Sequence, residues 1–149
     1  MKTWTESIEI HAPIERVWAL FDGSLENMQK MMPQVVENKP LKVTENQIGS
    51  VYRQKYQEGK RVEEYDVETL EYTDTPEYKV LKVGFALAKM FDITAKYEMT
   101  RVSPDVTLFK YTATNKALKW FVHVLLLMVS SKVVKRFVLR VKEIAENKE

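Results

Sequence analysis

The sequence has no cysteine among its 149 residues, which excludes disulfide bonds and thiolate chemistry. It has only four glycines, and it contains no P-loop, no dinucleotide-binding fingerprint and no nucleophile elbow. The N-terminal residues Met1–Glu6 lack the apolar stretch of a signal peptide. We therefore expect a cytoplasmic protein that uses none of these chemistries.

The chain also lacks a strong charge of one sign and a hydrophobic run long enough to span a membrane. Its 23 basic and 21 acidic residues give a net charge of +2, which is too small to indicate nucleic-acid binding. The uncharged run Trp120–Val129 has about half of the roughly 20 residues that a membrane span needs. A hydrophobic share of 45% in 149 residues is typical of one globular domain, predicted over residues 1–149.

The predicted elements are one strand, two short helices, six strands and one long helix. The strand 4–10 is followed by a helix that begins at Pro13 and ends before Asp22-Gly23, and by a second helix from Leu25 to Met32 with Ser24 as its N-cap. Turn signals such as Asn38-Lys39-Pro40 then separate six strands, near 41–45, 48–57, 60–72, 77–87, 90–102 and 106–115.

Alternation of apolar and charged residues gives the sheet one covered face and one solvated face. Short connections between successive strands predict antiparallel pairing. In the third strand, Tyr52, Gln54 and Tyr56 are expected on the covered face. The strand 60–72 shows apolar residues on both faces, so we expect a bulge there.

The C-terminal pattern 118–146 predicts one helix about 43 Å long. Its first third is apolar on every side, and from Val133 onward only one face is apolar. We expect Phe137 and Val141 to be buried and Arg136 and Arg140 to be exposed. The basic residues of this helix could contact an anionic membrane surface transiently, or could form an ordinary solvated face. These residues are Lys132, Lys135, Arg136, Arg140 and Lys142.

Two segments and the long final helix resemble the START-like, or SRPBCC, superfamily. Ile8–Trp18 is similar to its N-terminal signature, and Ile48–Tyr52 is similar to its glycine-led third strand. The resemblance covers the whole chain and extends to polyketide cyclase/dehydratase-like and birch-pollen-allergen-like proteins. It implies an α+β helix-grip fold, in which a seven-stranded curved antiparallel sheet wraps around a long C-terminal helix, with two short helices after the first strand.

The resemblance also implies a cavity between the sheet and the last helix, since members of the superfamily bind lipids, sterols, hormones and polyketides there. We therefore expect this chain to bind a small hydrophobic or amphipathic molecule that is lipid-, polyketide- or isoprenoid-like. Tyrosines on the covered face would offer such a ligand both apolar area and a hydroxyl, and the alternative for each single tyrosine is a core residue whose hydroxyl reaches backbone or solvent. The candidate ligand-binding residues are Tyr52, Tyr65, Phe85, Phe91, Tyr97, Phe109, Tyr111, Trp120 and His123.

Two alternative functions remain open at this stage. In the first, the chain is a polyketide cyclase/dehydratase-like enzyme in which His123 moves protons together with a tyrosine or with Glu6. Only some members of the superfamily are enzymes and they share no catalytic motif, so no other catalytic residue is predicted. In the second, the cavity is collapsed and the outer surface binds another protein.

Other kinds of partner and cofactor are not expected. The acidic run Glu63–Glu71 has no histidine beside it, which indicates a solvated strand face and no metal site. We predict no cofactor and no nucleic-acid partner. The expected partner is a small hydrophobic ligand, bound by a monomer or a homodimer.

Overall fold

A computed structural model describes residues 1–87, 91–117 and 131–147. Within these ranges there are seven strands and three helices. The strands are β1 (Lys2–Ile10), β2 (Val35–Lys42), β3 (Val51–Glu58), β4 (Arg61–Asp74), β5 (Tyr78–Leu87), β6 (Phe91–Ser103) and β7 (Val106–Ala117). The helices are α1 (Ile14–Ala19), α2 (Leu25–Met31) and α3 (Ser131–Glu146).

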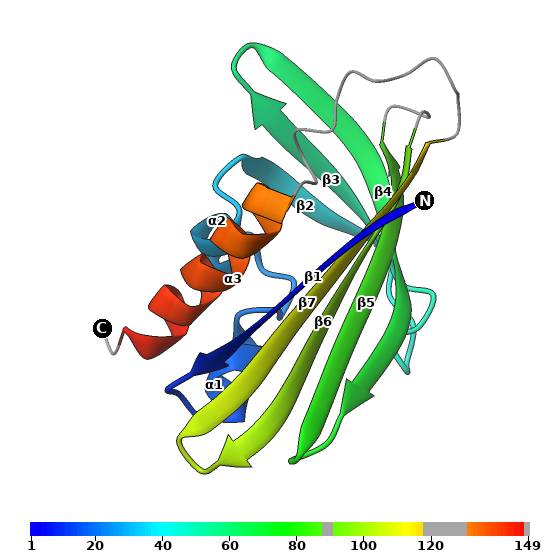
Figure 1. Ribbon diagram of the computed structural model, residues 1–149. Coiled ribbons are helices and arrows are strands. Elements are labelled where there is room, and N and C mark those ends of the chain that lie inside the picture. The colour runs from blue at the N-terminus through cyan, green and yellow to red at the C-terminus, as the bar shows by residue number, and fades with distance from the viewer. Residues whose placement is uncertain (88–90, 118–130, 148–149) are drawn as a thin grey trace.

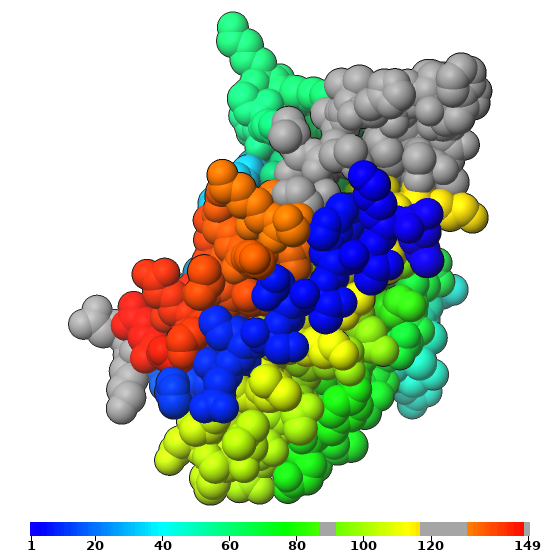
Figure 2. Space-filling model, in the orientation of Figure 1, coloured from blue at the N-terminus to red at the C-terminus, as the bar shows by residue number. Residues whose placement is uncertain are grey.

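The strands form one antiparallel sheet in the order β1-β7-β6-β5-β4-β3-β2, so that β1 and β2 are its edges. The sheet is strongly curved, and α2 and α3 lie together on one side of it (Figure 1). Helix α3 contacts β1, β7 and α2. Figure 2 shows β1, in blue, running beside α3, in orange to red. The predicted α+β helix-grip fold is thereby confirmed.

The described part of the C-terminal helix has the predicted buried stripe. Val134, Phe137, Val138, Val141 and Ala145 are buried, at the spacing of one helical face. They pack with sheet residues in the hydrophobic core. The N-terminal part of the predicted helix, residues 118–130, lies outside the described residues.

The turn between α1 and α2 has the predicted local signals. Gly23 has a φ of +84°, a conformation that side chains with a Cβ rarely adopt. The Ser24 hydroxyl then accepts a hydrogen bond from the backbone N–H of Asn27 at 3.2 Å, which caps α2. The carbonyl of Gly23 accepts a hydrogen bond from Asn38 Nδ2 of β2, so this turn lies beside the sheet edge that β2 forms.

The predicted second strand was placed wrongly. Strand β2 covers Val35–Lys42, not 41–45, and the supposed turn Asn38-Lys39-Pro40 lies inside it. Proline is tolerated there because β2 is an edge strand. The third strand begins at Val51 rather than near 48, because Gly49 with a φ of +86° still belongs to the preceding turn.

The expected bulge in the strand after β3 is confirmed. The pairing of β4 with β5 shifts between Thr69 and Glu71. Tyr65 and Val67 are buried, whereas Val62 and Leu70 are exposed. The bulge therefore leaves one continuous covered face on β4.

A buried lysine connects α1 to the sheet. The side chain of Lys79 on β5 is only 2% exposed, and its Nζ lies 3.0 Å from Glu15 Oε1 of α1. It also pairs with Asp74 at the end of β4 and lies 5.7 Å from the centre of the Trp18 ring. Burial alone would lower the pKa of Lys79, but hydrogen bonds and attraction from Asp74 and Glu15 raise it overall. No motif in the sequence assigns a role to this residue.

Candidate ligand-binding cavity

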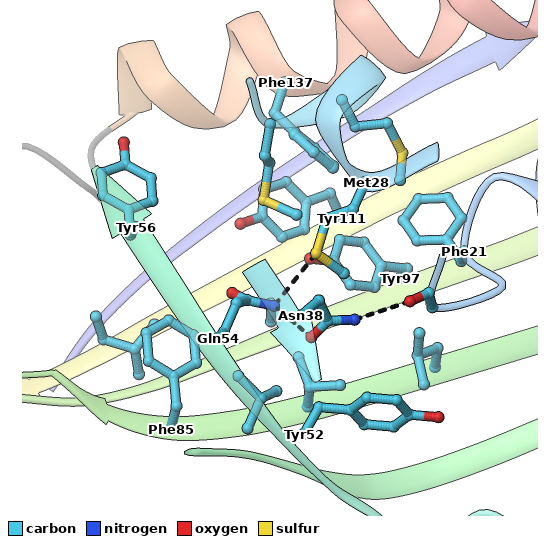
Figure 3. A pocket seen from close by; sticks show the side chains of 18 of the residues that line it. Phe21, Met28, Asn38, Tyr52, Gln54, Tyr56, Phe85, Tyr97, Tyr111 and Phe137 are labelled. Carbon is cyan, nitrogen blue, oxygen red and sulfur yellow. Dashed lines mark hydrogen bonds between the residues drawn. The ribbon is translucent and has the colours of Figure 1, made fainter. Parts of the chain in front are cut away.

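A cavity of about 440 Å³ lies among the sheet, α2 and α3 (Figure 3). Its described lining comes from β2 to β7, from the segment 20–34, from Gln47 and from α3. The volume falls within the range of small-molecule sites in proteins, roughly 300–1,000 Å³. The apolar side chains of this lining are Leu20, Phe21, Met28, Met31, Met32, Val67, Leu81, Val83, Phe85, Ile93, Ala95, Val133 and Phe137.

A chain of hydrogen bonds crosses one wall of the cavity. The Tyr65 hydroxyl donates to Gln54 Oε1 at 3.0 Å, and Gln54 Nε2 donates to Asn38 Oδ1 at 3.3 Å. Asn38 Nδ2 donates in turn to the carbonyl of Gly23 at 2.8 Å (Figure 3). The bonds link β4, β3, β2 and the loop before α2. The polar atoms they satisfy can therefore lie beside apolar surface at little cost.

Two tyrosines form a second polar feature of the wall. The rings of Tyr97 and Tyr111 are stacked with centroids 5.2 Å apart, and the Phe137 ring lies 4.8 Å from that of Tyr111. Burial raises the pKa of Tyr97 well above its ordinary value and that of Tyr111 to about 12, so both phenols are neutral at physiological pH. Among the residues that the structure describes, neither hydroxyl has a hydrogen-bond partner. Both are therefore available as donors to a ligand.

Two arginines of α3 also line the cavity. Arg136 is exposed, as predicted, but Arg140 is half-buried, which corrects the prediction for that residue. Its Nη1 donates a hydrogen bond to the backbone carbonyl of Met31 at 3.1 Å, because α2 packs beside α3. With Val133 and Phe137 the arginines occupy positions i, i+3, i+4 and i+7, and so share one helix face.

The predicted site residues have different positions. Tyr52, Tyr65, Phe85, Tyr97 and Tyr111 line the cavity. Phe109 does not: it has 0% exposure and packs in the core, with its ring centroid 5.9 Å from that of Phe21. Trp120, His123 and the side chain of Phe91 lie outside the described residues. Whether the lining residues bind a ligand stays a prediction.

Glu6, the predicted carboxylate partner of His123, is not among the residues that line the cavity. Its Oε1 lies 4.0 Å from Lys135 Nζ, and its side chain is 32% exposed. A contact between Glu6 and His123 falls outside the described residues.

Several lining residues were not predicted from the sequence. Asn38 was assigned to a turn, because the position of β2 was misjudged. The methionines of 28–32 were seen only as part of a short helix. The density of methionine there was a usable signal, since flexible thioether side chains suit surfaces that accommodate varied ligands.

Other kinds of site were sought in the part of the chain that the structure describes. No cluster of three or more histidine, aspartate or glutamate side chains there could hold a metal ion. No helix within these ranges is long and apolar enough to cross a membrane.

Comparison with known proteins gives a family and a fold. The family model described as "Polyketide cyclase / dehydrase and lipid transport" matches residues 1–146. No curated protein sequence matches the chain significantly.

The similar solved structures have low sequence identity. Norcoclaurine synthase from Thalictrum flavum, in complex with dopamine and hydroxybenzaldehyde, has a TM-score of 0.69 and 12% identity over 99% of this chain and 88% of its own. The Zhui aromatase/cyclase from Streptomyces sp. R1128 also has a TM-score of 0.69 and 12% identity, over 97% and 93%. A conserved protein from Geobacillus kaustophilus has a TM-score of 0.64 and 17% identity, over 97% and 95%. Likeness at this level of identity is evidence for the fold alone.

Proposed function

The chain belongs to the polyketide cyclase / dehydrase and lipid transport family, and we propose that it binds a small hydrophobic or amphipathic molecule between its sheet and α3. The ligand would be lipid-, polyketide- or isoprenoid-like. The observation that carries the proposal is the cavity of about 440 Å³, whose surface is mainly apolar and whose wall also carries hydroxyl, amide and guanidinium groups. A ligand that enters it would gain roughly 25 cal/mol for each Å² of apolar surface removed from water.

The polar groups of the wall would orient the ligand. The hydroxyls of Tyr97 and Tyr111 could each donate to a carbonyl or hydroxyl of the ligand, since they have no partner among the described residues. A ligand with one polar group and an apolar body fits this arrangement better than a pure hydrocarbon, which would leave both donors unpaired.

A cyclase/dehydratase-like activity is the second candidate, and the same two phenols favour it. A neutral phenol near a ligand carbonyl can polarise that carbonyl, as a general acid does. The reaction would also need a base, for which His123 is the predicted residue. Substitution His123→Leu separates the candidates. A binding protein should keep most of its affinity for apolar ligands, whereas an enzyme should lose turnover while it still binds.

The alternative in which the outer surface binds another protein requires a collapsed cavity, and the cavity volume does not favour it. The predicted cytoplasmic location, the transient membrane contact and the monomeric or homodimeric state stay predictions.

Native mass spectrometry of the freshly purified protein, with extraction of any bound lipid, tests the proposal. We expect a bound molecule of low mass that organic solvent removes. Substitution Val83→Phe should reduce its occupancy, because Val83 lines the cavity and a larger side chain would fill it. Leu139→Phe on the exposed face of α3 is the matched control and should retain the ligand. Equal occupancy in both variants, at equal melting temperature, would contradict the proposal.

A further inference from the structure

Positively charged groups outnumber negatively charged ones in the described lining of the cavity. Its described lining has two guanidinium groups, Arg136 and Arg140, and one carboxylate, Glu58. Elsewhere on the described surface, basic side chains are often paired: Arg53 lies 3.0 Å from Asp66, and Lys55 lies 3.2 Å from Glu37. Among the described residues, neither arginine of the cavity has an acidic partner within ion-pair distance.

The two arginines are arranged to act together. They are four residues apart on α3, so their side chains leave the same face of the helix, one turn from each other. The bond from Arg140 Nη1 to the Met31 carbonyl holds that guanidinium at the wall and uses only one of its five N–H donors. Arg136 is exposed while lining the cavity, which places it at the opening.

We infer that the ligand of this cavity is an amphiphile with an anionic head group, and that Arg136 and Arg140 bind that head group at the opening. The inference rests on the proposed binding function and adds the class of ligand. The guanidinium fork matches the two oxygens of a carboxylate and binds phosphate oxygens in the same way. The apolar tail would lie against Phe137 and the sheet, and Tyr97 and Tyr111 would meet any polar group within it.

Displacement of the uncharged fluorophore N-phenyl-1-naphthylamine from the full-length chain tests the inference. Decanoate and decanol have the same tail and differ in the charge of the head group. We expect decanoate to displace the fluorophore at about tenfold lower concentration, the effect of one charge-assisted hydrogen bond. Raising the salt concentration should reduce this preference, because the arginines are partly exposed to solvent. Acetate, which has no tail, should not displace the fluorophore.

Substitutions assign the preference to the two residues. Arg136→Gln and Arg140→Gln should each reduce the preference for decanoate over decanol severalfold. Arg140→Lys keeps the charge without the fork and should give an intermediate value. Lys135→Gln is the matched control, since Lys135 is exposed on the same helix, lies near Glu6 and does not line the cavity. It should behave as the unmodified protein does.

The outcomes distinguish this inference from the proposed function. Equal displacement by decanoate and decanol, or an equal effect of Lys135→Gln and Arg136→Gln, overturns the inference while the binding function stands. Displacement by acetate at the concentrations at which decanoate acts also overturns it. Failure of the fluorophore and of both decyl compounds to bind overturns the inference and the proposed function together.

Discussion

The Tyr65 hydroxyl donates a hydrogen bond to Gln54 Oε1 at 3.0 Å, and both side chains are buried in the cavity wall. The bond joins β4 to β3 and begins the chain that ends at the carbonyl of Gly23. Tyr65→Phe should therefore lower the free energy of unfolding by about 1 kcal/mol, measured by urea denaturation. Tyr78→Phe removes a hydroxyl that bonds Glu98 at 2.8 Å in an exposed position, and should cost less than about 0.5 kcal/mol. Equal losses in the two variants would show that the buried hydrogen bonds stabilise the protein no more than the exposed one does.

The Lys79 ammonium has two carboxylate neighbours, and the loss of both should be worse than additive. Glu15→Gln or Asp74→Asn alone leaves one charge beside the buried ammonium, at an expected cost of about 1 kcal/mol. The double variant leaves the Lys79 ammonium with no carboxylate neighbour, so its loss in free energy of unfolding should exceed the sum of the two single losses. Thermal or urea unfolding of the four proteins completes the cycle. Strictly additive losses in the free energy of unfolding would contradict a Lys79 ammonium that is held by both carboxylates.

Phe137 is the aromatic side chain of α3 in the core. It is 9% exposed, with its ring centroid 5.8 Å from that of Tyr97. Phe137→Ala should lower the free energy of unfolding by about 3–5 kcal/mol, toward the lower end because one side of the ring faces the cavity. Leu139→Ala on the exposed face, where Leu139 is 57% exposed, is the control and should cost under about 0.5 kcal/mol. A loss below about 1 kcal/mol for Phe137→Ala would mean that α3 presents another face to the sheet.

Tyr111 should make the protein less stable at alkaline pH. Burial raises its pKa from about 10 in the unfolded chain to about 12 in the folded one. Between these values the unfolded chain releases the proton and the folded chain keeps it, so the free energy of unfolding falls by about 1.4 kcal/mol per pH unit. Below about pH 9 both states are protonated and the effect is absent.

Tyr111→Phe removes this contribution. Its free energy of unfolding should fall less steeply than that of the unmodified protein between about pH 10 and pH 11.5, measured by urea denaturation. Below pH 9 the difference between the two proteins should not depend on pH. Parallel curves over the whole range would contradict the burial of the Tyr111 hydroxyl.

Most of the fold could be predicted because the elements other than β2 have their own signals in the sequence. The stripe of α3 and the alternation of β6 reflect burial on one face, which depends on local spacing alone. Lys79 shares its parity with Leu81 and Val83, so the same rule places it on the covered face of β5. Its partners Glu15 and Asp74 come from other elements, and no local pattern reveals them.

The site could be predicted only in part. Alternation along a strand shows which face of the sheet a side chain is on, but not whether it lines the cavity or packs in the core. Tyr111 and Phe109 face the same side of β7, yet one lines the cavity and the other fills the core. The half-buried position of Arg140 depends on Met31 in α2, more than 100 residues earlier. Contacts between residues so far apart in the sequence arise from the packing of elements, which a local sequence pattern does not reveal.

The positions of the methionines allow the most direct test of the proposed binding function. Met28, Met31 and Met32 line the cavity, whereas Met99 is fully buried in the core and does not. Methyl NMR of the ¹³C-methionine-labelled protein, titrated with decanol, follows all four residues at once. We expect the methyl signals of Met28, Met31 and Met32 to shift until they saturate, while the Met99 signal does not move. Saturating shifts at Met99 alone, or no shift at the three lining residues, would contradict it.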